Sequence, residues 1–194
     1  EIMKKVATIL AVIFAVAFTA NTFAQATDNE VITITANLNT TMALTLDNSG
    51  IEFDFNTLED YNNGLGGYGS AYASEGSVSS TANWKLGFVA NDDFAHTDGT
   101  TTMPLNNLGV TVEWTGSNDV DVIAASKALD DAEELIIEHD GSNSNAGDDA
   151  ANSFTIYWEM GTKAGNMNSQ SIFEQDLKKG TYTVDVEFIL TEVL

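Results

Sequence analysis

Apolar and polar residues alternate along most of this chain. Because successive side chains of a β-strand point to opposite faces, a period of two predicts strands with one buried face. β-Branched and aromatic residues, which favour strands, are frequent in the alternating stretches. Strands are therefore expected at residues 31–35, 42–46, 51–55, 78–89, 110–114, 154–160 and 181–190.

One of these stretches carries a row of three large apolar side chains, Trp84, Leu86 and Phe88. An exposed row of this kind would promote aggregation, whereas burial contributes about 1.5–3 kcal/mol for each side chain. We therefore predict that the row faces a core. The last stretch would supply the matching apolar face, with Tyr182, Val184, Val186, Phe188 and Leu190.

Two segments depart from the alternation. Residues Asp60–Gly76 are rich in glycine, asparagine and tyrosine without a helical period, which predicts a loop or a sheet edge. In Asp121–Glu138, apolar residues recur every three or four positions, which predicts a short helix. The triplet Leu135-Ile136-Ile137 fits the beginning of a strand equally well.

Many short strands separated by turn signals predict an all-β fold, an antiparallel β-sandwich of Greek-key or immunoglobulin-like type. No composition shift divides the chain after its first segment, so residues 27–194 are expected to form a single domain.

The first 26 residues have the pattern of a bacterial secretory signal peptide. Lys4 and Lys5 precede an apolar run, and Ala24-Gln25-Ala26 provides small residues for cleavage. Glu1 and Ile2 lie upstream of Met3, the expected initiator. A membrane anchor is the alternative, but the apolar run from Val6 to Ala20 is shorter than the ~20 residues that a spanning helix needs. We expect a secreted protein with no membrane span after cleavage.

The chain is strongly acidic, with a formal net charge of −22 and no arginine. This charge disfavours nucleic acid and anionic membranes as partners, and it favours divalent cations or a basic partner. No cysteine is present, so stability must come from the burial of apolar surface and not from disulfides.

Catalytic residue sets are scarce, and an enzyme is not expected. The chain has two histidines, His96 and His139, without the paired spacing of zinc sites. Aspartates are abundant in two loops, and their oxygens suit calcium, a candidate cofactor. The candidate calcium ligands are Asp92, Asp93, Asp98, Asp140, Asp148 and Asp149.

Tyrosines in the glycine-rich segment provide candidate ligand-binding residues. Tyr61, Tyr68 and Tyr72 could stack on sugar rings, as in a carbohydrate-binding module. The competing interpretation is that they pack over the end of the sandwich.

Two short motifs resemble those of bacterial WxL-type cell-surface domains. The internal motif is "NWKLGF" at Asn83–Phe88, and the final strand "GTYTVDVEFIL" at Gly180–Leu190 occupies the place of the second motif. Phe188 stands where that family has its second tryptophan. The resemblance implies a non-enzymatic surface protein that contacts a cell-surface polymer or protein.

The segment "DLKKGTY", Asp176–Tyr182, resembles the tyrosine corner of Greek-key sandwiches. Similar endings occur in secreted pilus and spore-coat-like subunits. This resemblance implies an alternative function, a filament subunit that self-associates when the strand Val31–Thr35 adds to a neighbour's sheet.

Overall fold

The computed structural model describes residues 33–47 and 50–194. Residues 39–194 form one compact unit, and residues 33–38 belong to a separate N-terminal unit. The expected signal peptide lies outside the described residues, as do Val31 and Ile32 of the first predicted strand. The rest of that strand, residues 33–35, pairs with no strand of the described residues, although its composition favours a strand.

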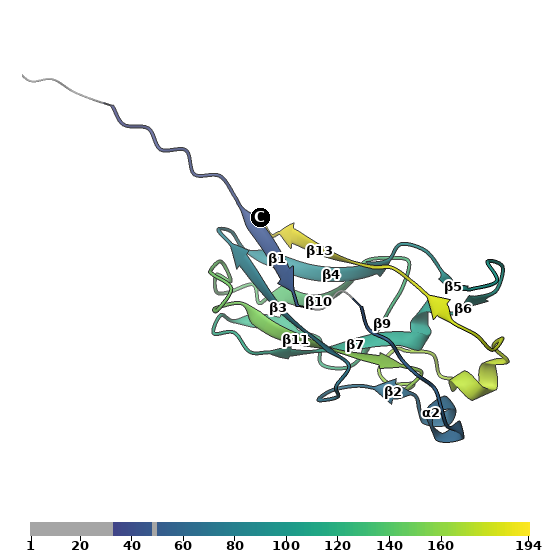
Figure 1. The fold of residues 1–194 in the computed structure, drawn as a ribbon. Coiled ribbons are helices and arrows are strands. Elements are labelled where there is room, and N and C mark those ends of the chain that lie inside the picture. Colours follow the sequence, from purple (N-terminus) through teal and green to yellow (C-terminus); the bar gives the residue numbers. More distant parts are fainter. Residues whose placement is uncertain (1–32, 48–49) are drawn as a thin grey trace, which may run out of the picture. The chain divides into compact units, whose positions relative to one another are not determined.

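The compact unit is built from antiparallel sheets that pack as a sandwich (Figure 1). The larger sheet has the order β1-β3-β11-β7-β9, and β2 also pairs with β11. Its strands are β1 (Met42–Leu46), β2 (Leu65–Gly66), β3 (Ala73–Ser80), β7 (Leu108–Trp114), β9 (Lys127–Ala128) and β11 (Ser153–Met160).

The second sheet has the order β13-β4-β10-β8, and a small third sheet has the order β12-β5-β6. These strands are β4 (Trp84–Ala90), β5 (Phe94–His96), β6 (Thr102–Met103), β8 (Val120–Val122), β10 (Glu134–His139), β12 (Tyr182–Thr183) and β13 (Val186–Glu192). The predicted all-β sandwich is confirmed.

The row of large apolar side chains on β4 lies in the core, as predicted. Trp84, Leu86 and Phe88 are each 0% exposed. The closing strand β13 pairs directly with β4, and Phe188 lies opposite Phe88. The Phe188 ring also meets Trp158 of the facing sheet edge-on, with centroids 5.9 Å apart. The two stretches predicted to share a core therefore lie side by side in one sheet.

The predicted helix over residues 121–138 is wrong. The segment instead contributes β8, β9 and β10, which pair with β10, β7 and β4 respectively. A bulge between Leu135 and Ile137 turns two adjacent residues inward, so that Ile136 and Ile137 are both buried. That irregularity, together with short strands joined by turns, produces a three-to-four-residue apolar spacing without a helix.

The prediction of a loop or a sheet edge over residues 60–76 is correct in part, since the short strand β2 lies there and pairs with β11. Helix α2 covers Leu58–Asn63, and β3 begins at Ala73. Thr57 and Asp60 form a reciprocal capping box that starts the helix, a local signal that lies in the sequence "TLED". Two 3-10 helices follow at Leu105–Asn107 and Ile172–Gln175. Among the described residues, no helix is long and apolar enough to cross a membrane.

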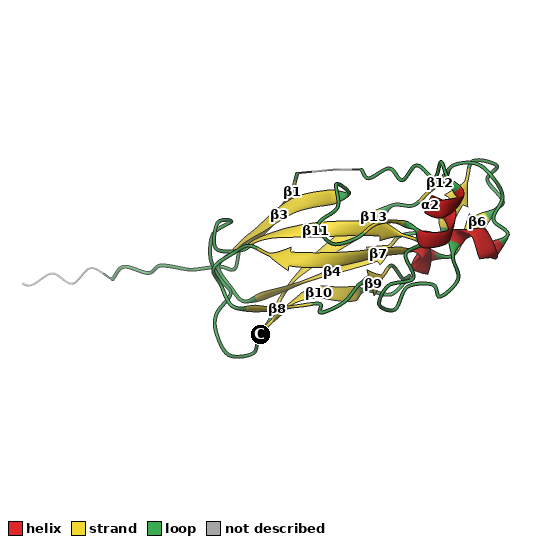
Figure 2. Cartoon of the chain, turned by 90° about the horizontal axis from the view of Figure 1, so that it is seen from below, coloured by secondary structure: helices red, strands yellow, loops and turns green. Residues whose placement is uncertain are grey.

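The strand predicted at residues 51–55 is extended but belongs to no sheet. Its side chains alternate between half-buried and exposed, and Ile51, Phe53 and Phe55 pack against the core. Figure 2 shows residues 50–57, which lead into α2, running along one edge of the sandwich. The period of two therefore predicted the buried face correctly, whereas no ladder of backbone hydrogen bonds joins this segment to another described residue.

Candidate functional site

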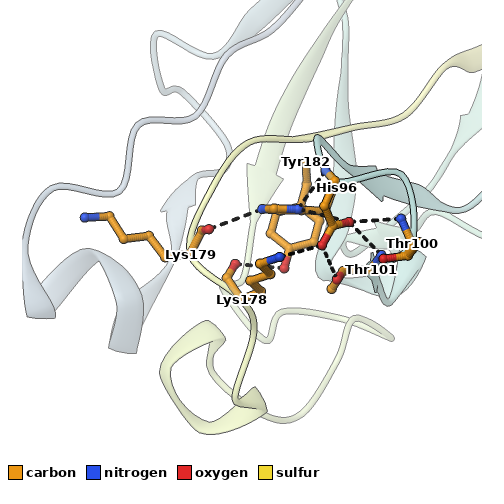
Figure 3. Close-up of polar contacts among 7 residues, drawn as sticks. His96, Thr100, Thr101, Lys178, Lys179 and Tyr182 are labelled. Carbon is orange, nitrogen blue, oxygen red and sulfur yellow. Dashed lines mark hydrogen bonds and ion pairs between the residues drawn. The ribbon is translucent and has the colours of Figure 1, made fainter.

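The tyrosine corner predicted at the end of the chain is present (Figure 3). The Tyr182 hydroxyl donates a hydrogen bond to the Lys178 carbonyl at 2.8 Å. The ring of Tyr182 also meets the buried His96 ring edge-on, with centroids 4.9 Å apart. Gly180 allows the backbone before Tyr182 to lie close to the His96 ring, because a Cβ at position 180 would lie 2.1 Å from His96 Nε2.

His96 connects two loops through both of its ring nitrogens. Its Nε2 is 3.2 Å from the Lys179 carbonyl oxygen, and its Nδ1 accepts the backbone N–H of Asp98 at 3.1 Å. An acceptor at Nδ1 places the proton on Nε2, which then donates to the carbonyl. His96 is therefore engaged on both sides in structural hydrogen bonds.

Asp98 completes this cluster by pairing with a lysine across the corner. Its Oδ2 lies 2.7 Å from Lys178 Nζ and accepts the Thr101 hydroxyl at 2.7 Å. Its Oδ1 accepts the backbone N–H groups of Thr100 and Thr101, each at 2.9 Å. The Lys178 ammonium, followed by these donors, holds the pKa of Asp98 well below its usual range. Asp98 therefore links the β5–β6 turn to the segment before β12 through an ion pair with Lys178.

The six aspartates predicted as calcium ligands do not converge. Within residues 33–47 and 50–194, no three histidine, cysteine, aspartate or glutamate side chains gather as a metal site would require. Asp140 and Asp148 instead accept backbone N–H groups of their own loops, from Ser142 and Ala151 among others. Asp149 does the same with the N–H of Ala150, and Asp92 and Asp93 are exposed in the turn after β4.

His139, the second histidine, ends β10 and accepts the backbone N–H of Gly141 at its Nδ1, 3.1 Å away. Its Nε2 is buried and has no hydrogen-bond partner in the part of the chain that the structure describes. The two histidines take part in separate loops, so no shared site joins them.

The three candidate sugar-binding tyrosines do not form one platform. Tyr72 stacks on Phe53 with centroids 4.5 Å apart, and Tyr61 lies against Phe55 at 5.3 Å. Both are half-buried and pack against the core, which agrees with the competing interpretation. Tyr68 differs, because 65% of it is exposed.

One residue that the sequence analysis missed fixes the end of the core row. Asn145 is fully buried, and its side chain accepts the N–H of Trp84 at 3.0 Å and donates to the Trp84 carbonyl at 2.9 Å. The indole Nε1 of Trp84 donates to the Asn145 carbonyl at 2.8 Å. We call these three hydrogen bonds the Asn145 clamp. The pairing of β10 with β4 ends at Leu86, so the clamp takes the place of a neighbouring strand at Trp84.

The sheet edges are the other distinctive feature. β1 and β13 are the terminal strands of their sheets. The segment Ile51–Phe55 makes no backbone-to-backbone hydrogen bond with any described residue. Extended backbone without a ladder is available for pairing with another strand.

Comparison with protein-family models and with curated proteins gives no match. The resemblance to WxL-type domains therefore remains a prediction that rests on the two short motifs.

Proposed function

We propose that this protein is a secreted, non-enzymatic structural or adhesive component of a bacterial cell surface or extracellular matrix, similar in outline to WxL-type domains. The observation that carries the proposal is that two side chains capable of acid–base chemistry, those of His96 and Asp98, are occupied by structural contacts. His96 is hydrogen-bonded at both ring nitrogens, and Asp98 is paired with Lys178. These side chains stabilise loops, which supports a structural role for the protein.

Fractionation of the source bacterium tests the location. The mature chain is expected in the culture medium or the cell-surface fraction, and amino-terminal sequencing should begin at Thr27. Recovery of the intact chain from the cytoplasm would refute this part of the proposal.

Assembly by β-strand addition is a second candidate, favoured by the unpaired segment Ile51–Phe55. A strand from a second copy would supply the missing backbone partners there. The N-terminal stretch Val31–Thr35 fits this role, because its alternation provides apolar side chains for one face. In the described part of that stretch, Ile34 is 89% exposed.

Electron microscopy and light scattering of the purified protein test the assembly. Filaments or oligomers are expected, together with slower hydrogen exchange at the amides of residues 51–55 on assembly. Ile34→Asp should abolish assembly, because it places a charge on the face that would be buried. Thr33→Asp is the matched control, since it changes the opposite face and should retain assembly. A protein that stays monomeric at every ionic strength refutes this candidate.

A further inference from the structure

Tyr68 is held outward by a glycine turn on the edge of the larger sheet. The N–H of Ser70 donates to the Gly67 carbonyl at 3.0 Å, and Gly69 has φ 75°, the pattern of a type II turn. The N–H of Gly67 donates to the Trp158 carbonyl at 2.9 Å, which ties the turn to β11. The backbone that carries the exposed Tyr68 side chain is therefore fixed in position by hydrogen bonds.

The ring lies against a second tyrosine and close to a carboxylate. The centroids of Tyr68 and Tyr157 are 5.0 Å apart, and the planes are tilted by 56°. The Tyr157 hydroxyl donates to Glu113 Oε2 at 2.8 Å. Hydrogen bonding with Glu113 raises the pKa of Tyr68, and the tyrosine hydroxyls lower the pKa of Glu113. Glu113 is therefore ionised at neutral pH and accepts a hydrogen bond from the Tyr157 hydroxyl.

The surroundings of this group are negative. Glu75 lies near enough to add to the raised pKa of Tyr157. Among the described residues, the lysines that form ion pairs are Lys127 and Lys178, and their partners are other carboxylates. Glu113 thus has no cationic partner there, and it lies at the hydroxyl end of Tyr157, whose ring meets that of Tyr68.

We propose that Tyr68, Tyr157 and Glu113 form a binding site for an organic cation, an alkylammonium or guanidinium group. Aromatic faces attract such cations, and the carboxylate adds a charge partner. A sugar is a poorer fit, because the Tyr157 hydroxyl is already engaged with Glu113. The acidic charge of the whole chain raises the local concentration of basic ligands. This site lies outside the residues that the sequence analysis selected, except for Tyr68.

NMR titration of the purified protein tests the site with tetramethylammonium as the probe. The amide signals of Gly67, Gly69 and Glu113 are expected to shift in a saturable way. Neutral tert-butanol, which has a similar shape without charge, should cause no saturable shift. N-Acetyl-lysine amide distinguishes the source of the cation. Tighter binding of this compound than of tetramethylammonium points to a protein partner, and the reverse points to a free quaternary ammonium compound.

Three variants separate the contributions. Tyr68→Leu should weaken tetramethylammonium binding roughly five- to tenfold, whereas Tyr68→Phe, which keeps the ring face, should retain most of it. Glu113→Gln should weaken binding by a similar factor and reduce its dependence on salt. Phe173→Leu is the matched control, because Phe173 is an exposed aromatic residue elsewhere and should leave binding unchanged.

Several results would overturn the proposal. They are equal saturation by tert-butanol, binding of methyl glucoside without binding of the cation, or full binding by a folded Tyr68→Leu variant. Tyr68 is exposed, so its variants should fold even if Glu113→Gln does not, and dispersed NMR spectra verify this.

Discussion

Replacing Asn145 by alanine would remove the two side-chain hydrogen bonds of the Asn145 clamp. The N–H and C=O of Trp84 would then remain buried without these partners. An unsatisfied buried polar group costs about 1–3 kcal/mol, so the loss of partners for both groups should lower the free energy of unfolding by about 2–6 kcal/mol. This is a large effect for a loop residue, since a domain of this size is only marginally stable.

Urea denaturation followed by tryptophan fluorescence measures the change, and an unaltered m-value would show that the unfolded state is unaffected. Asn145→Asp separates hydrogen bonding from packing, because it nearly preserves side-chain volume but removes the donor to the Trp84 carbonyl. We expect it to be destabilised as well. Asn143→Ala is the matched control in the same loop, where the asparagine is exposed. A loss for Asn145→Ala no larger than that for Asn143→Ala would refute the reasoning.

Three further predictions concern the core and the tyrosine corner. Leu86→Ala should lower the free energy of unfolding by about 2–5 kcal/mol, because Leu86 is fully buried. Urea denaturation measures the loss, and a loss as small as that of a surface residue would contradict the prediction. Tyr182→Phe should cost about 0.5–1.5 kcal/mol through the lost hydrogen bond to the Lys178 carbonyl, and an unchanged midpoint would contradict this. Asp98 has a lowered pKa in the folded protein, so it stabilises the fold above its unfolded pKa of about 4, and this contribution is lost as the pH falls through the folded pKa. Asp98→Asn should therefore be less stable than the parent near neutral pH, and thermal melts should show the difference shrinking below about pH 4. A difference that does not depend on pH would disprove the role of charge.

Periodicity was a good guide wherever one face of a strand is buried. The alternation around Trp84 and Phe188 predicted their shared core, because register and burial are linked by the period of two. The tyrosine corner was also predictable, since its residues are four positions apart and the hydrogen bond is local. The capping box of Thr57 and Asp60 is equally local, and it could have predicted α2.

Contacts between distant segments could not be read from the pattern. Residues 121–138 have a helical spacing of apolar residues, but they form strands that pair with β4 and β7. These partner strands lie elsewhere in the chain, so the local pattern could not predict the pairing. Asn145 lies 61 positions from Trp84, and nothing in its loop distinguishes it from the neighbouring asparagines. The proximity of Tyr68 to Tyr157 and Glu113 depends on three segments meeting at one sheet face.

The sequence by itself determined which faces are apolar, and therefore the all-β class and the residues of the core. Only the tertiary structure decided which strands pair, which polar side chains replace a missing strand, and which tyrosine remains exposed. The physical reason is that apolar periodicity is a property of neighbouring residues. Hydrogen-bond partners and exposure depend on chain segments that folding brings together from far apart.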